Sequence, residues 1–263
     1  MTPHRPVALV TGASSGIGLA LARVLAREGH DLVLVARREP ELARLAAELK
    51  SRYGADATVI TADLSVPSGP ANVFDAVAAA GLDIDVLVNN AGFGGQGRFT
   101  DTDAGTEQRM LAVNVVALTE MTKLFLPAMT RRATGQVLNV ASTAAFQPGP
   151  FMAVYYASKA YVLSFTEALA EELAGTGVTA TALCPGVVPS GFQDAANLRD
   201  DAPMLKSPGA KSTEFVAEAA YDGMTRGRRI VIPGMLNKIG VQSLRVSPRR
   251  AVVGLVRRLH PPD

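Results

Sequence analysis

Residues 7–18 read VALVTGASSGIG, a run of four apolar residues followed by a loop with three glycines. The apolar run is typical of a buried strand, and the residues after the loop have the three- and four-residue apolar spacing of a helix. Glycine lets the backbone turn sharply and approach a pyrophosphate, while the amino end of a helix offers free N–H groups and partial positive charge. The stretch therefore predicts a strand, a phosphate-binding turn and a helix. The residues expected at the phosphates are Gly12, Ser14, Ser15, Gly16, Ile17 and Gly18.

Short runs rich in Val, Ile and Leu recur along the rest of the chain, with helical spacing between them. They are apolar without alternation, as strands covered on both faces are. Repeated strand–helix–strand units imply right-handed crossovers and a parallel sheet, so we expect an α/β fold. Glycines at positions 29 and 54 follow the first two predicted helices, where a left-handed residue is favoured. The predicted strands are residues 7–10, 32–35, 58–61, 86–88, 137–140, 178–183 and 230–232.

The composition narrows the classes of protein. Hydrophobic residues make up 48% of the 263 residues and charged residues 19%, which supplies enough apolar surface for a core and excludes disorder. The net charge of +2 is too small for a dedicated nucleic-acid binder. The single cysteine, Cys184, and three scattered histidines exclude an internal disulfide and argue against a metal site. No targeting or membrane-spanning segment stands out, so we expect a cytoplasmic protein.

No linker or shift in composition divides the chain, so we expect one domain over residues 1–263. Two segments interrupt the strand–helix rhythm. Residues 187–211 are too long for an ordinary connection and are interpreted as a loop on the substrate side. Residues 235–260 are apolar and basic and predict one or two amphipathic helices. This tail has three interpretations, namely subunit packing, a lid, or contact with an anionic membrane surface, and subunit packing is the simplest.

The glycine loop also fits G-x-S-x-G, the nucleophile turn of α/β-hydrolases, through Gly12, Ser14 and Gly16. That interpretation needs an acid and then a histidine further along the chain. His30 and His260 are poorly placed for this role, so the hydrolase remains a distant alternative.

The end of the second predicted strand selects between dinucleotides. A carboxylate there binds the ribose 2′-hydroxyl, whereas arginine accommodates a 2′-phosphate. The sequence has Arg37 and Arg38 at this place and no carboxylate, which predicts NADP(H) over NAD(H), with Arg37 as the first choice. The alternative is a solvated arginine pair that opens a surface helix.

Further motifs follow in order: Asn89-Asn90-Ala91-Gly92 after the fourth strand, Ser142 after the fifth, and Tyr155-x-x-x-Lys159. Together with the glycine loop, they resemble the short-chain dehydrogenase/reductase family over residues 7–190. The resemblance implies a three-layer αβα, doubly wound Rossmann fold with a mostly parallel seven-stranded sheet, and an NAD(P) cofactor. It implies the catalytic set Asn114, Ser142, Tyr155 and Lys159. It also implies cofactor contacts by the glycine loop, Arg37, Asp63, Leu64, Asn90, Ala91, Gly92, Tyr155, Lys159, Pro185, Gly186, Val188 and Ser190, the last a serine where many members have threonine.

The chemistry of these residue types agrees with that implication. Reduction of a ketone leaves an alkoxide, which needs a proton donor. Lys159 lies one helical turn from Tyr155, and its charge, with that of an oxidised nicotinamide, is expected to lower the pKa of the phenol. Ser142 is expected to donate to the substrate oxygen. The loop of residues 143–153 can return the chain so that Ser142 meets Tyr155.

Four residues in or near these motifs also allow an ordinary structural role. Tyr156 points about 100° away from Tyr155 around the helix and is expected to pack or to touch another subunit. The family role of Asn114 is a helix bend with a water-linked proton path to Lys159, and the alternative is a satisfied core asparagine. Asp63 could cap a turn instead of touching adenine. Cys184 is expected to be a small core residue.

These observations predict an NADP(H)-dependent oxidoreductase that interconverts a ketone or aldehyde and an alcohol. The alternative is a cofactor-binding redox sensor or scaffold without turnover. The family commonly assembles through the helices at residues 105–131 and 152–173, so a homodimer or homotetramer is expected. An apolar, lipid-like small-molecule substrate is predicted from aromatic and apolar residues around the site, namely Phe93, Phe146, Phe151, Phe192 and Met204.

Overall fold

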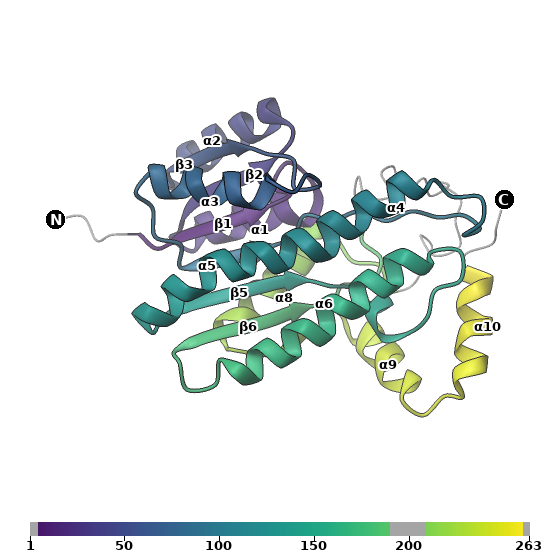
Figure 1. Cartoon of the computed structure of the whole chain (residues 1–263). Coiled ribbons are helices and arrows are strands. Elements are labelled where there is room, and N and C mark those ends of the chain that lie inside the picture. Colours follow the sequence, from purple (N-terminus) through teal and green to yellow (C-terminus); the bar gives the residue numbers. More distant parts are fainter. Residues whose placement is uncertain (1–4, 190–208, 260–263) are drawn as a thin grey trace.

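The computed structural model describes residues 5–189 and 209–259, and its centre is one seven-stranded sheet (Figure 1). The strand order is β3-β2-β1-β4-β5-β6-β7, and every adjacent pair is parallel. The order reverses between β1 and β4, which opens a crevice at the carboxyl ends of these strands. The strands are β1 (Val7–Thr11), β2 (Asp31–Ala36), β3 (Ala57–Thr61), β4 (Val86–Asn89), β5 (Gly135–Val140), β6 (Val178–Leu183) and β7 (Ile230–Val231).

Helices cover both faces of the sheet. One apolar cluster joins α1, α2 and α8 to one face, and a second joins α3, α5 and α6 to the other (Figure 1). This confirms the predicted three-layer αβα fold. The helices are α1 (Gly16–Arg27), α2 (Glu39–Tyr53), α3 (Gly69–Ala79), α4 (Ala104–Leu111), α5 (Leu118–Arg132), α6 (Ala153–Glu172), α8 (Thr213–Thr225), α9 (Met235–Leu244) and α10 (Arg249–Leu259), with a π-helical turn at Ala112–Ala117 and a 3-10 helix at Thr143–Phe146.

The strands begin or end within two residues of the predicted bounds. β5 starts at Gly135 instead of residue 137, because the polar Gln136 continues the ladder beside Val86. Gly54 is left-handed, with φ +63°, and ends α2 as predicted. Gly29, just after α1, also has a positive φ, of +92°.

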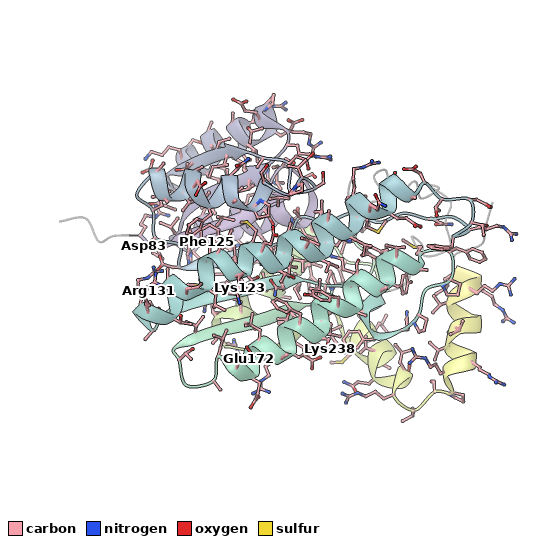
Figure 2. The ribbon with its side chains drawn as sticks, viewed as in Figure 1. Asp83, Lys123, Phe125, Arg131, Glu172 and Lys238 are labelled. Carbon is pink, nitrogen blue, oxygen red and sulfur yellow. The ribbon has the colours of Figure 1, made fainter. Side chains whose placement is uncertain are left out.

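The continuous helix Ala104–Arg132 is long and apolar enough to cross a membrane by length and composition alone. In this structure it lies along the sheet, and its side chains Met121, Phe125 and Met129 are buried in the core beneath it. One side of the helix therefore packs against the sheet. Figure 2 shows Lys123 and Arg131, with their polar ends, on the same helix.

The predicted loop at residues 187–211 lies mostly outside the described residues, and so do its Phe192 and Met204. The tail contains two helices, α9 and α10, where one or two were predicted. They lie together at one end of the molecule, beside the carboxyl ends of β5 and β6 (Figure 1). His260 lies outside the described residues.

Candidate active site

The glycine loop between β1 and α1 has a backbone conformation and a close packing that require glycine. Gly12 and Gly16 have φ of +66° and +57°, which L side chains rarely adopt. A Cβ on Gly18 would lie 2.4 Å from the carbonyl oxygen of Gly12, so the helix is pressed against the loop. Ser15 is the N-cap of α1, and its side chain makes no capping hydrogen bond. These features fit a pyrophosphate held by backbone N–H groups.

Asn90 holds the glycine loop to the end of β4. Its Nδ2 donates to the carbonyl oxygens of Thr11 (2.8 Å) and Gly12 (3.3 Å). The hydroxyl of Thr11 in turn accepts from the backbone N–H groups of Asn90 and Ala91, at 2.9 and 3.0 Å. Sequence reasoning predicted cofactor contacts at Asn90 and Ala91 but missed Thr11. The signal was available, since Thr11 is the polar residue that ends an apolar strand.

The two arginines after β2 are both exposed. The Arg38 Nη2 donates to the hydroxyl of Ser14 at 3.1 Å, so its side chain lies against the glycine loop. Arg37 lies near Asp63, whose pKa is held below its usual value mainly by hydrogen bonds from Ser65 and, more weakly, by the Arg37 charge.

Asp63 therefore forms a turn with Ser65, and its contact with adenine stays a prediction. Leu64 is buried in the core on the side of α3 and α5.

Ser142 and Tyr155 meet at the carboxyl end of β5. Ser142 follows this strand and Tyr155 lies in the first turn of α6, and their hydroxyl groups are hydrogen-bonded. The Ser142 Oγ also accepts from the N–H of Ala144 at 3.1 Å, which fixes it at the start of the 3-10 helix. The loop returns the chain as predicted. Burial raises the pKa of Tyr155 to about 12, although the bond from Ser142 lowers it.

Lys159 lies one turn further along α6 and is only 5% exposed. Its Nζ donates to the carbonyl oxygen of Val140 at 2.8 Å and is 5.9 Å from the centre of the Tyr155 ring. Burial lowers the pKa of Lys159 to about 8. In the protein alone, burial therefore disfavours the charged form of both groups, and the lowering of the Tyr155 pKa by the charges of Lys159 and an oxidised nicotinamide stays a prediction.

Asn114 lies in the π-helical turn between α4 and α5 and is almost fully buried. Its Oδ1 accepts from the N–H of Phe93 at 3.1 Å, and its Nδ2 donates to the Phe93 carbonyl and to Ser158 Oγ, both at 3.0 Å. Ser158 donates to the carbonyl oxygen of Tyr155 at 2.7 Å. A Cβ on Gly92 would lie 2.8 Å from Asn114 Oδ1 and 3.4 Å from Lys159 Nζ, so these groups converge at the exposed Gly92.

Ser158 was not predicted from sequence, because its side-chain partner Asn114 lies 44 residues away in the chain. Tyr156 is buried, and its ring packs on Gly149, where a Cβ would lie 2.2 Å from Cδ2. Tyr156 therefore belongs to the wall behind Tyr155, which is one of the two roles expected for it. Burial also raises the pKa of Cys184 to about 12, in keeping with a core residue.

The segment after β6 borders the same site. Pro185 accepts from the N–H of Thr143 at 2.9 Å, which ties it to the Ser142 segment. A Cβ on Gly186 would lie 2.6 Å from the side chain of Asn237 in α9, a neighbour that nothing in the sequence indicated. Val188 is buried. Ser190, the last predicted cofactor contact, lies outside the described residues.

A cavity of about 300 Å³ opens beside the amino end of α6. Its wall mixes apolar side chains, such as Phe99, Met110 and Phe151, with the acidic Asp103 and Glu107. Of the aromatic residues predicted around the substrate, Phe151 lines this cavity, whereas Phe146 packs in an apolar cluster with α6 and β6. Phe151 has φ +66°, which places a bulky side chain in a strained left-handed conformation next to the site.

The hydrolase alternative finds no support in this geometry. The Ser14 hydroxyl accepts from Arg38. His30 is buried at the far end of α1, where its Nδ1 bonds the Leu25 carbonyl. Among residues 5–189 and 209–259, no three His, Cys, Asp or Glu side chains gather as metal ligands.

The parallel sheet with a reversal in strand order, a glycine loop at the reversal and a Ser–Tyr–Lys cluster beside it define a dinucleotide-binding oxidoreductase. The model of the short chain dehydrogenase family matches residues 6–201. The chain belongs to the short-chain dehydrogenase/reductase family, which binds NAD(P)(H), and it is an enzyme that interconverts carbonyl and alcohol groups.

Three similar proteins illustrate the family. The ketoacyl reductase HetN of Nostoc sp. is 37% identical over 180 residues, which cover 68% of this chain and 62% of the relative. A short-chain dehydrogenase from Sphingobium yanoikuyae in complex with NADPH is 32% identical, with a TM-score of 0.81, and the match covers 94% of this chain and 97% of that one. A family member from Burkholderia phymatum in complex with NAD is 29% identical, with a TM-score of 0.80 over 90% of this chain and 92% of that one.

Proposed function

We propose that the protein is an NADP(H)-dependent oxidoreductase for an apolar ketone, aldehyde or secondary alcohol, with Asn114, Ser142, Tyr155 and Lys159 as its catalytic set. The observation that carries the proposal is the hydrogen bond between Ser142 and the half-buried Tyr155, with the buried Lys159 one turn away. The alternative of a sensor or scaffold without turnover has no observation in its favour.

Tyr155 is the proposed proton donor. When bound, a nicotinamide dinucleotide supplies or accepts hydride, and the protein must manage the charge on the substrate oxygen. Since the pKa of Tyr155 is about 12, its phenol carries a proton at neutral pH, which is the form needed for reduction of a carbonyl. Ser142 offers a second hydrogen bond to the same oxygen as negative charge develops.

Lys159 and Asn114 are proposed to assist proton transfer from Tyr155 indirectly, the first through its charge and the second by positioning. With a pKa of about 8, Lys159 is mostly protonated at neutral pH, and its charge favours loss of the phenolic proton during the reaction. Asn114 acts as a positioning residue, because it holds Ser158, which in turn bonds the backbone of Tyr155. It also fixes the backbone at Phe93, next to the end of β4.

The preference for NADP(H) rests on Arg37 and Arg38. Both are exposed at the end of β2, and Arg38 already lies against the Ser14 side of the glycine loop. A guanidinium group matches the oxygens of a 2′-phosphate, and the strand ends without a carboxylate to bind a 2′-hydroxyl. One similar structure is a complex with NADPH and another a complex with NAD, so the proposal rests on these two arginines.

The apolar substrate is proposed from Phe99, Met110 and Phe151, which line the cavity at the amino end of α6 together with the acidic Asp103 and Glu107. The name of the HetN relative, a ketoacyl reductase, agrees with a carbonyl on an apolar chain. We further propose a homodimer or homotetramer through the long helices, on which Leu111, Val116 and Tyr161 expose apolar surface. A single domain and a cytoplasmic location remain predictions.

The test is NADPH consumption across a panel of carbonyl compounds, with the parent protein and Tyr155→Phe. Loss of the proton donor should lower kcat by about a thousandfold while cofactor fluorescence titration stays unchanged. Tyr161→Phe is the matched control, since it removes a phenolic hydroxyl from the exposed side of the same helix, where Tyr161 bonds Thr119. Parent-like turnover by Tyr155→Phe would refute the catalytic assignment, and turnover only of small, strongly charged substrates would refute the apolar one.

A further inference from the structure

The helix α9 presents apolar side chains away from the protein, the reverse of an ordinary surface helix. Met235, Leu236 and Ile239 are 69%, 56% and 58% exposed, whereas Val241 on the opposite side is buried. Val246, in the turn after the helix, is 86% exposed. Large apolar side chains that gather on one exposed face mark an interaction surface.

The next helix, α10, is amphipathic and extends this face. Its inner side is anchored, because Val252 and Val256 pack with Ala144, Met152 and Tyr156. Leu255 and Leu259, one step around the helix, are 59% and 40% exposed. The inner contacts hold the helix in place, so the outer leucines are presented by a fixed element.

The charge of α9 and α10 has a single sign. Residues 235–259 contain six basic residues and no Asp or Glu. In the part of the chain that the structure describes, none of these cations pairs with a carboxylate. Figure 2 shows nitrogen-tipped side chains of α10 that point away from the sheet. The six are Lys238, Arg245, Arg249, Arg250, Arg257 and Arg258.

We propose that this tail surface, the exposed apolar side chains of α9 and α10 with the six cations, docks on an anionic lipid bilayer. Apolar side chains beside a run of Lys and Arg are the pattern of helices that lie in the membrane interface. A second copy of the chain fits less well, because a two-fold contact of this face with itself would bring twelve positive charges together without a carboxylate.

Docking would place the bilayer beside the candidate active site. The inner side of α10 packs on Tyr156, the direct neighbour of Tyr155, and α9 contacts Gly186 through Asn237. An apolar substrate dissolved in the membrane would then be close to the site. The docking itself does not depend on the proposed function, and its test needs no turnover.

The test is co-sedimentation of the full chain with phosphatidylcholine vesicles that contain or lack phosphatidylglycerol. Binding is expected only with phosphatidylglycerol and should weaken as salt is added. Arg257→Ala with Arg258→Ala should lower the partition coefficient about fivefold for each cation removed. The matched control is Arg44→Ala with Arg228→Ala, which removes the same charge from exposed positions on α2 and before the amino end of β7.

Ile239→Asp and Leu255→Asp should each lower vesicle binding about tenfold or more, because they remove apolar contact and add a like charge. Val66→Asp, at an exposed valine outside the tail surface, should not. Size-exclusion chromatography with light scattering completes the design. The proposal is overturned by absence of binding to phosphatidylglycerol vesicles, or by equal losses in the tail and control variants. It is also overturned if Ile239→Asp changes the oligomeric state while vesicle binding is absent, which assigns the face to a contact between copies.

Discussion

The glycine loop and the segment from Ser142 to Lys159 lie at the same edge of the sheet but are built in different ways. The loop offers backbone, since Gly12 and Gly16 have positive φ and Gly18 leaves no room for a side chain. The catalytic segment offers side chains, and its functional groups come from β5, α6 and the π-helical turn. One half of the site depends on local backbone geometry and the other on packing.

This difference decides what each half tolerates. In the loop, a single added methyl group meets backbone that cannot move aside. In the catalytic segment, the groups keep their places through buried hydrogen bonds, such as Lys159 to Val140 and Asn114 to Ser158. Burial also shifts the pKa values of Tyr155 and Lys159. Substitutions should therefore change cofactor binding in the first region and protonation in the second.

The largest effect on cofactor binding is expected for Gly18→Ala. Its Cβ would lie 2.4 Å from both the Gly12 oxygen and the Asn90 side chain, so α1 must move away from the loop. The unfolding free energy should fall by about 3 kcal/mol, and the same strain in the loop would raise the dinucleotide Kd roughly a hundredfold. Chemical denaturation and fluorescence titration measure the two effects.

Gly254→Ala is the matched control for this substitution, because no heavy atom lies within 4 Å of the place that its added methyl group would take. It should leave cofactor binding unchanged and stabilise α10 by up to about 1 kcal/mol. If Gly18→Ala, like Gly254→Ala, lowers neither the unfolding free energy nor the affinity for the cofactor, close packing of α1 against the loop does not limit which residue position 18 accepts.

The second effect concerns the buried Lys159. Because its pKa falls from 10.5 in the unfolded chain to about 8 in the folded protein, only the unfolded chain holds this proton between these pH values. Stability should therefore rise with pH from about 8 to 10.5, by about 3 kcal/mol for a shift of this size. Below pH 8 both the folded protein and the unfolded chain hold the proton, so this gain in unfolding free energy is absent. Lys159→Met removes the titration, so the difference between the parent and this variant should follow that window.

Lys123→Met provides the control, since Lys123 is exposed on α5 (Figure 2). Its unfolding free energy should depend on pH as that of the parent does. Parallel curves for the parent and Lys159→Met over pH 8 to 10.5 would mean that the lysine keeps an ordinary pKa in the folded protein.

The backbone half of the site could be predicted from sequence because its signals are local. The apolar run at residues 7–10 and the glycine spacing determine β1, the turn and α1 without distant partners. The same holds for Gly54, whose positive φ ends α2. The order of Ser142, Tyr155 and Lys159 predicted their meeting, since the segment between β5 and α6 leads directly from one element to the next and returns the chain to the end of the strand.

The rest depended on packing that the sequence does not display. The direction of the Tyr155 pKa follows from how deeply its hydroxyl is buried, and spacing along a helix gives no measure of that. The partners of Asn114 are Phe93 and Ser158, which are 21 and 44 residues away. The outward apolar face of α9 could not be predicted from sequence, because periodicity alone does not say which side of a helix faces the protein.

The smallest effect is expected at Arg37, which follows β2 beside the glycine loop. Arg37→Ala should weaken NADPH binding about tenfold, because one charge-assisted hydrogen bond at an exposed site is lost, while NADH binding stays the same. Arg38→Ala should also reduce the preference for NADPH over NADH, and it removes the hydrogen bond to the Ser14 hydroxyl. Arg44→Ala, at an exposed arginine further along α2, is the control and should change neither Kd.

Fluorescence titration with both cofactors measures the ratio of the Kd values for NADH and NADPH. Tighter binding of NADH than NADPH by the parent protein would reverse the proposed cofactor assignment. It would not bear on the glycine loop, because the pyrophosphate that this loop is proposed to hold is common to both cofactors.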